Sequence, residues 1–186
     1  MMDTERCAEF IRAYDGPPIR LMEVCGTHTH SIFEHGIRSL LPVGITLISG
    51  PGCPVCVTPA GYIDRAAALS KLANHTLCTF GDMLRVPGER GNLLEAKAAG
   101  GDVRMMYSPL DVLRWAEAEP QRTFVVAAVG FETTLPVYAL LMERLTERGA
   151  RNVKLLASLK AILPALTWIC ESEPDIDGFL GPGHVS

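Results

Sequence analysis

The sequence predicts an α/β fold in which parallel sheets are covered by helices on both faces. Short apolar, β-branched runs alternate along the chain with longer stretches of helical pattern, and each run ends in a turn rich in glycine or polar residues. Strands that alternate with helices form right-handed βαβ units and therefore parallel sheets. The chain has 186 residues, 48% of them hydrophobic and 20% charged, which suits one complete α/β domain plus part of a second similar one.

Seven strands are expected where the apolar runs occur, at residues 19–24, 45–49, 76–80, 103–107, 124–129, 153–158 and 176–180. Helical patterns lie between them, at residues 31–41, 58–74, 92–99, 109–119, 134–148 and 160–171. The first of these helices is expected to begin with Ser31 and Glu34 in the spacing of a capping box. The second has Pro59 at its first helical position, where proline is favoured.

A polar, proline-bearing stretch at residues 117–122 indicates a domain boundary. We expect the first α/β domain to cover residues 1–119 and a second to begin at residue 120, with only its start present up to residue 186. The last expected strand leads into a Gly-Pro-Gly turn without a following helix. An interrupted βα unit of this kind indicates a fragment of a longer protein.

The charge pattern argues against several classes of function. The net charge is −4 and no cluster of lysine and arginine exceeds two residues, so neither nucleic acid nor an anionic membrane is expected as the main partner. No apolar run approaches the roughly 20 residues of a membrane span, and the N-terminus lacks the apolar core of a secretion signal. A cytoplasmic location is therefore expected. The glycine motifs of nucleotide-binding loops and the GxSxG motif of serine hydrolases are also missing.

Reactive side chains gather where the expected strands end, which is where open parallel sheets bind ligands. The loops concerned have the sequences CGTHTH (25–30), GPGCPVC (50–56), GD (81–82), GFETT (130–134) and GPGH (181–184). Because the carboxyl ends of parallel strands meet at one edge of a sheet, we expect residues of these loops to converge on one or two clefts.

The cysteines form the most informative pattern. Cys53 and Cys56 stand at the CxxC spacing, so both sulfurs can point at one atom, and the preceding glycines allow a tight turn beneath them. Cys25, at the end of the neighbouring strand, adds a third thiolate, and three soft ligands suit zinc, iron or copper(I). Since the chain has no second CxxC, a closed structural zinc site is less favoured. Two other interpretations stay open, a redox dithiol near a helix N-terminus and a pair of cysteines buried in a turn.

Histidines and acids in the same loops are candidates for proton transfer. His28 and His30 flank the start of an expected helix, where each is a ligand, a proton donor or a group that fixes the turn. His184 lies in a Gly-Pro-Gly turn, which favours a functional role. Asp82 and Glu132 directly follow strands, where either orients a histidine, accepts a proton or caps the next helix.

Four motifs, MEVCGTHTH (22–30), GPGCPVC (50–56), GFETT (130–134) and GPGHVS (181–186), occur in this order and together resemble the HypD family of [NiFe]-hydrogenase maturation factors. The resemblance implies a scaffold on which the Fe(CN)2CO group of the hydrogenase is assembled. It also implies two partners, a HypC-type chaperone and a HypE-type protein that donates cyanide.

The resemblance assigns roles to the residues that match the motifs. Cys25, Cys53 and Cys56 match the motif cysteines that hold iron and take part in thiol redox chemistry. Their thiolates are strong donors that favour the binding of CO and cyanide to low-spin iron. His28, Glu132 and His184 are then candidates for proton transfer or for orienting the bound groups.

One feature of the family is missing from these residues. Its members are about twice as long, and a C-terminal segment carries four cysteines that bind a [4Fe-4S] cluster. These ligands are absent from the 186 residues, so this chain is not expected to hold that cluster as the family does. The leading hypothesis is an iron-binding assembly scaffold with redox-active thiols rather than a classical enzyme. The alternatives are a thiol–disulfide oxidoreductase that uses Cys53 and Cys56, and an inactive fragment.

Overall fold

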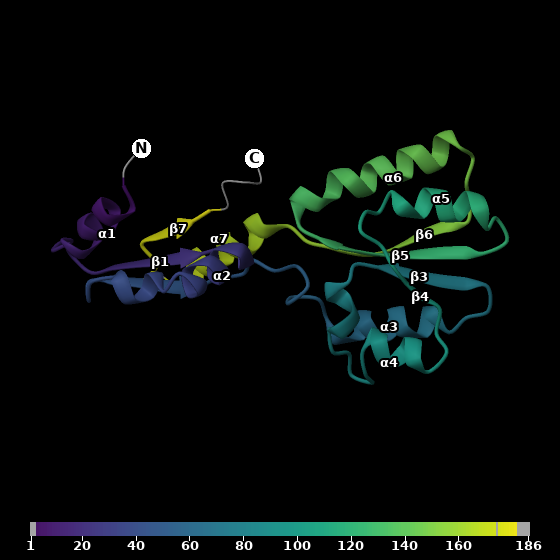
Figure 1. The fold of residues 1–186 in the computed structure, drawn as a ribbon, viewed down its shortest axis with the longest axis horizontal. Coiled ribbons are helices and arrows are strands. Elements are labelled where there is room, and N and C mark those ends of the chain that lie inside the picture. The colour runs from purple at the N-terminus through teal and green to yellow at the C-terminus, as the bar shows by residue number, and fades with distance from the viewer. Residues whose placement is uncertain (1–2, 174, 182–186) are drawn as a thin grey trace. The chain divides into compact units, whose positions relative to one another are not determined.

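The computed structural model describes residues 3–173 and 175–181. The chain divides into two compact units, each considered separately below (Figure 1). Unit 1 comprises Met1–Cys53 and Ile162–Ser186, and unit 2 comprises Pro54–Ala161. Each unit contains one sheet, and every strand pair in the described residues is parallel. The α/β class with parallel sheets is therefore confirmed.

Unit 2 is built on a four-stranded sheet with the strand order β4-β3-β5-β6. The strands are β3 (His75–Thr79), β4 (Val103–Met105), β5 (Thr123–Gly130) and β6 (Val153–Leu159). The chain first moves from β3 to β4 and then returns to the other side of β3 to form β5 and β6. The strand order thus reverses between β3 and β5, the place at which open α/β sheets bind ligands.

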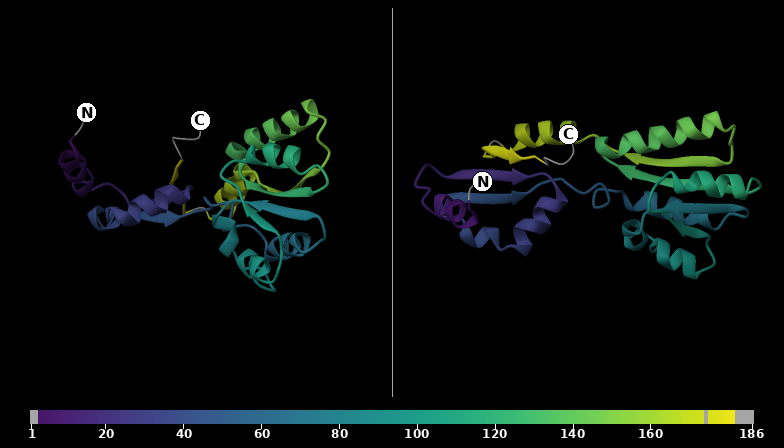
Figure 2. Two further views of the ribbon diagram at one scale, coloured as in Figure 1. Left: turned by 45° about the vertical axis from the view of Figure 1, so that its right-hand side comes forward. Right: turned by 45° about the horizontal axis from the view of Figure 1, so that its top comes forward.

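Helices cover both faces of this sheet, as the two views in Figure 2 show. They are α3 (Ala60–Ser70), α4 (Leu93–Ala98), α5 (Asp111–Ala118) and α6 (Leu135–Glu147). Strand β5 shows why both faces need cover, because its successive side chains enter two different cores. Phe124, Val126 and Ala128 pack in one hydrophobic cluster with residues of α5 and α6. The intervening side chains, beginning with Val125, pack in a second cluster with residues of α3 and α4.

Unit 1 has a three-stranded sheet with the order β2-β1-β7. Its elements are α1 (Thr4–Arg12), β1 (Ile19–Glu23), α2 (Gly26–Glu34), the 3-10 helix η1 (Ile37–Leu40), β2 (Ile45–Ser49), α7 (Ile162–Ser172) and β7 (Gly178–Leu180). Glu23, the last residue of β1, is in register with Ser49 of β2 and Leu180 of β7. The carboxyl ends of all three strands are therefore level, and their loops begin side by side.

The seven expected strands are all present within a few residues of their expected bounds. The helix expected at 31–41 is wrong at its start, because α2 begins at Gly26, directly after β1, and ends at Glu34. Cys25 takes the extended N-cap conformation there, and its carbonyl oxygen accepts a hydrogen bond from the Thr29 amide at 3.1 Å. Ser31 thus lies inside the helix and does not cap it. Helix α1 was not expected.

The division into units differs from the boundary expected at residues 119–120. Strand β5, which follows that point, pairs with β3 and β6, whereas β7 pairs with β1. The chain therefore leaves unit 1 after Cys53 and returns to it at Ile162. The polar stretch at 117–122 comprises the end of α5 and its connection to β5, in which Arg122 forms ion pairs with Glu119 and Asp102.

No helix within the described ranges is both long and apolar enough to cross a membrane.

Candidate functional site

The candidate site lies in unit 1, where β1 and β2 end. The loop after β1 carries Cys25 and the loop after β2 carries Cys53. Two backbone hydrogen bonds join these loops, one from the Gly50 amide to the Glu23 carbonyl at 2.8 Å and one from the Gly26 amide to the Gly52 carbonyl at 3.3 Å. The expectation that the two cysteine loops follow neighbouring strands is therefore confirmed.

Gly52 allows the two loops to approach this closely. A Cβ atom at this position would lie 2.6 Å from both the Cα and the backbone nitrogen of Cys25, which is closer than real Cβ contacts occur. On the other side of the contact, a Cβ atom on Gly26 would lie 3.9 Å from the Cβ atom of Cys53. The side chain of Cys53 thus stands next to the N-terminus of α2, whose N-cap residue is Cys25.

The position of Cys25 favours its thiolate. Burial opposes ionisation, but hydrogen bonds from the backbone amides of His28 and Thr27 and from the Thr27 hydroxyl outweigh it, so the pKa of Cys25 lies below its usual value. Cys25 holds the N-cap position of α2, and the amides at a helix N-terminus attract a negative sulfur. The negative charge of Glu23 works in the opposite direction and raises the pKa.

Glu23 is a buried acid directly beneath these loops that the sequence-based candidates did not include. Its side chain accepts hydrogen bonds from the hydroxyls of Thr29 and Ser49, and its carboxylate lies 3.8 Å from the guanidinium of Arg38. The available signal in the sequence was an acidic residue near the end of the largely apolar run at 19–24, two positions before Cys25.

The predicted histidines differ in their surroundings. His28 is half-buried in the first turn of α2. His30 is exposed and forms a helical ion pair with Glu34, with 3.5 Å between Nε2 and Oε2, so its contact is that of a surface residue. His184 lies outside the described residues. The strand that precedes it ends at Leu180, whose carbonyl accepts a hydrogen bond from the Val24 amide at 3.2 Å.

The remaining predicted residues belong to unit 2. Cys56 is exposed in the turn at 54–57, which Thr58 closes through a hydrogen bond from its hydroxyl to the Pro54 carbonyl at 2.8 Å. Asp82 opens the 3-10 helix η2 (Asp82–Arg85) after β3, and Glu132 opens η3 (Glu132–Thr134) after β5. Since β3 and β5 are neighbours, both acids lie at the carboxyl edge of this sheet, where its strand order reverses.

The structure thus brings together the loops of Cys25 and Cys53 and places Cys56 and Glu132 in the other unit. In the ranges 3–173 and 175–181, no three side chains of histidine, cysteine, aspartate or glutamate are arranged as a set of metal ligands. The three-thiolate iron site therefore stays a prediction.

A comparison with models of protein families shows to which family the chain belongs. The family model described as "Hydrogenase formation hypA family", HypD, matches residues 4–186. The chain belongs to the HypD family.

Curated relatives agree with this assignment. The chain is 47% identical over 171 residues to "Hydrogenase maturation factor HypD" of Escherichia coli (strain K12), which covers 91% of this chain and 46% of the relative. It is 49% identical over 174 residues to the protein of the same name from Rhizobium leguminosarum bv. viciae, covering 89% and 45%. With the Rhodobacter capsulatus protein of that name it shares 42% over 187 residues, covering 100% and 50%. The chain spans about half the length of these relatives.

The cysteines outside the motifs do not fit the [4Fe-4S] cluster that the HypD family implies. Cys78 is fully buried in the core of unit 2, where burial raises the pKa of its thiol to about 12. Cys7 lies on α1 and Cys170 on α7. Because the described part of the chain offers no cluster of metal-ligating side chains, these three do not form a cysteine set for a cluster.

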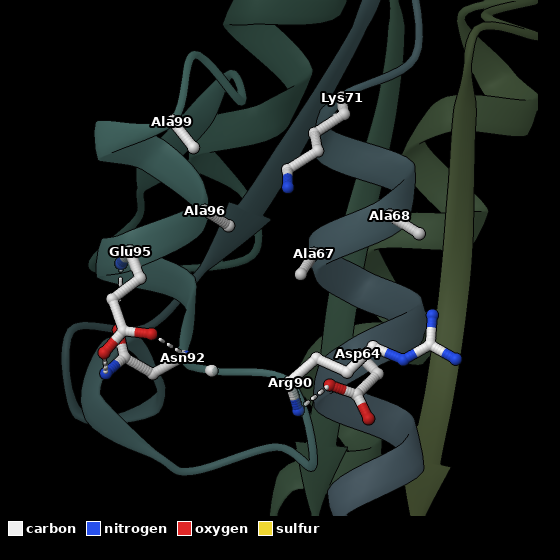
Figure 3. Close-up of a pocket in the computed structure, with 10 residues that line it drawn as sticks. Asp64, Ala67, Ala68, Lys71, Arg90, Asn92, Glu95, Ala96 and Ala99 are labelled. Atoms are coloured by element: carbon white, nitrogen blue, oxygen red, sulfur yellow. Dashed lines mark hydrogen bonds between the residues drawn. The ribbon is translucent and has the colours of Figure 1, made fainter.

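The HypD-family chain also has a shallow groove between α3 and α4, with a volume of about 320 Å³ (Figure 3). Alanines form much of its wall. Its two acids serve the local fold, since Asp64 accepts hydrogen bonds from the amides of Glu89 and Arg90, and Glu95 caps α4 together with Asn92. The groove contains none of the predicted site residues.

The thiols of Cys25 and Cys78 are expected to react with iodoacetamide under different conditions. Because the thiolate is the nucleophile and the pKa of Cys25 is lowered, its alkylation in the native, metal-free protein should reach half its maximal rate at a lower pH than in urea. Cys78 should react only after unfolding. Mass spectrometry of the labelled peptides measures both, with the exposed Cys170 as an accessible control. Equal profiles for Cys25 in the folded and unfolded protein would contradict the expectation.

Proposed function

We propose that this chain forms part of a scaffold that holds iron through the thiolates of Cys25, Cys53 and Cys56 while the Fe(CN)2CO group of a hydrogenase is assembled. The observation that carries the proposal is the junction of two cysteine loops at the level ends of β1 and β2, joined by backbone hydrogen bonds and by the close approach at Gly52. The names of the relatives, which are hydrogenase maturation factors, support the same conclusion.

The iron is the substrate of this scaffold, and the cysteines suit it chemically. Thiolates are soft, strongly donating ligands that select iron over magnesium or calcium. Each thiol releases its proton when it binds the metal, and the amides around Cys25 favour that loss. The CxxC spacing gives Cys56 as the third sulfur, only three positions after Cys53 in the chain. Strong sulfur donors in turn favour CO and cyanide as further ligands of the iron.

The other candidates are assigned supporting roles. His28, Glu132 and His184 transfer protons or orient the groups bound to iron. A HypC-type chaperone and a HypE-type cyanide donor are the proposed protein partners. Since the chemistry needs reduced thiols, we place it in the cytoplasm. No step is assigned to a [4Fe-4S] cluster.

Single cysteine variants of the full-length protein test the proposal. Cys25→Ala, Cys53→Ala and Cys56→Ala should each lower the iron content of the anaerobically purified complex and weaken the infrared bands of bound cyanide and CO. Cys170→Ala, which removes an exposed thiol on α7, is the matched control and should change neither. The proposal fails if all three motif variants keep the iron and the infrared bands of the wild type.

The same samples separate this function from thiol–disulfide exchange, the alternative that the exposed position of Cys56 in its turn favours. A metal-free protein with a reversible Cys53–Cys56 disulfide, detected by thiol titration beside metal analysis, would support the oxidoreductase instead. Retained iron together with titratable thiols would support the scaffold.

A further inference from the structure

Glu23 is a charged residue that unit 1 buries completely. Its exposed fraction is 0%, and within the described ranges it is the only buried residue among the aspartates, glutamates, lysines, arginines and histidines. A buried carboxylate loses its hydration and persists only where other groups replace the lost water. The contacts that Glu23 makes therefore indicate why an acid stands at the end of β1.

The two oxygens of this carboxylate reach two different elements. Oε2 accepts a hydrogen bond from the Thr29 hydroxyl at 3.0 Å, and Thr29 belongs to the turn of α2 that begins at Cys25. Oε1 accepts a hydrogen bond from the hydroxyl of Ser49, the last residue before the loop of Cys53. One side chain thus joins the helix that starts at Cys25 to the strand that leads to Cys53.

Arg38 of η1 supplies the opposite charge. Its Nη2 lies 3.8 Å from Oε1 of Glu23 and donates to the Ser49 hydroxyl at 3.3 Å. Its Nη1 donates to the carbonyl of Leu47 in β2 at 3.0 Å. The guanidinium therefore pairs with the carboxylate and holds β2 at the same time. Glutamine has nearly the shape of glutamate but not its charge, so it does not reproduce this set of contacts.

Two other roles for Glu23 are disfavoured. A carboxylate that takes the proton of the Cys25 thiol should turn an oxygen toward that sulfur, but Oε2 and Oε1 of Glu23 accept hydrogen bonds from the hydroxyls of Thr29 and Ser49. A carboxylate that binds the ligand itself should be accessible from the loops, but this one is fully buried. What remains is the geometric connection between the two cysteine loops.

We propose that Glu23 is a positioning residue that holds the loops of Cys25 and Cys53 at the separation required for both sulfurs to bind one metal ion. This inference rests on the proposed function, in which these thiolates hold iron. Partners in the outer shell of a metal site typically change metal affinity by about 10- to 100-fold when they are replaced, and we expect a loss of that size for Glu23.

The first experiment measures metal binding by the full-length protein under anaerobic conditions, with Co²⁺ as the probe. Glu23→Gln and Glu23→Asp should keep the far-ultraviolet circular dichroism of the wild type. Both should bind Co²⁺ about 10- to 100-fold more weakly and lose part of the thiolate-to-cobalt absorption. The shorter aspartate is included because it keeps the charge but does not span both loops. Wild-type affinity and absorption in Glu23→Gln would overturn the proposal.

Asp102→Asn is the matched control. Asp102 of unit 2 also accepts a hydrogen bond from a threonine hydroxyl, that of Thr76 at 2.7 Å, and also pairs with an arginine, Arg122. Its replacement breaks a network with the same types of partner in the other unit, around an acid that is 40% exposed. It should lower the unfolding temperature and leave the cobalt spectrum unchanged, so loss of stability alone would not explain the result for Glu23.

A second experiment needs no metal and separates this inference from the proposed function. In a Cys56→Ser background, dibromobimane joins the thiols of Cys25 and Cys53 only when they are close together. Glu23→Gln should slow this cross-linking about tenfold or more in the folded protein. If the wild type does not bind Co²⁺ but Glu23→Gln still slows the cross-linking, the positioning role is supported and the proposed function is contradicted. An unchanged rate would overturn the positioning role.

Ser49→Ala replaces Glu23→Gln in both experiments if Glu23→Gln does not fold. It removes one of the two hydroxyl contacts of Glu23, so it also tests whether this carboxylate holds the two cysteine loops together.

Discussion

Replacing Gly52 with alanine is expected to weaken the proposed iron binding strongly. The added methyl group would lie 2.6 Å from the backbone of Cys25, and backbone atoms, unlike the end of a flexible side chain, have no alternative rotamer. The two cysteine loops must therefore separate, which strains the hydrogen bond from the Gly26 amide to the Gly52 carbonyl. We expect iron affinity to fall by about 10- to 100-fold or more and stability by about 1–3 kcal/mol. Anaerobic iron titration and urea unfolding measure the two effects.

Gly61→Ala provides the control for this variant. Gly61 lies in α3, and a Cβ atom there meets nothing within 4 Å. This change should therefore leave iron binding unaffected. Because alanine has a higher helix propensity than glycine, it should also raise stability by up to about 1 kcal/mol. Normal iron binding by Gly52→Ala, with Gly61→Ala behaving as expected, would show that the close approach of the loops is not needed for the site.

The strands of this fold were predictable because their signal is local. A strand buried on both faces appears in the sequence as a continuous apolar run, and β5 is such a strand, with side chains from Phe124 to Val129 divided between two cores. The start of α2 was missed because cysteine is not a preferred N-cap residue, whereas Ser31 with Glu34 matched a capping pattern.

The division of the chain was not predictable from local patterns, because it depends on which strands pair. Leu21 is in register with Gly178, far along the chain, and nothing near either residue in the sequence indicates this partner. The polar, proline-bearing stretch at 117–122 has the composition of a linker. It is instead fixed within unit 2 by the ion pairs of Arg122 with Glu119 and Asp102.

The candidate site likewise has one feature that the sequence predicts and one that depends on residues far apart in the chain. The spacing of the cysteines, together with the order of the strands, was enough to predict that the loops of Cys25 and Cys53 are neighbours. The role of Glu23 depends on hydroxyls that are six and twenty-six positions away, on Thr29 and Ser49. Serine and threonine are common on protein surfaces, so their sequence positions gave no reason to connect them with a buried acid.

The core of unit 2 provides a second large effect, one on stability. Leu141→Ala is expected to lower the free energy of unfolding by about 2–5 kcal/mol, because the leucine is fully buried and its loss leaves a cavity in a close-packed core. Leu141 lies on α6, in the cluster that contains Phe124 and Tyr138. Urea unfolding followed by circular dichroism measures the change.

Met142→Ala is the matched control, since it removes a large side chain from the next position of the same helix. Met142 is 43% exposed, so its replacement removes less buried apolar surface and should cost clearly less than Leu141→Ala. The comparison also tests the packing of α6 onto the sheet. If α6 were rotated by one residue, Met142 would face the core and the two variants would exchange their effects. Equal losses would mean that the two side chains do not differ in burial as described, and the cover that α6 provides for β5 would have to be revised.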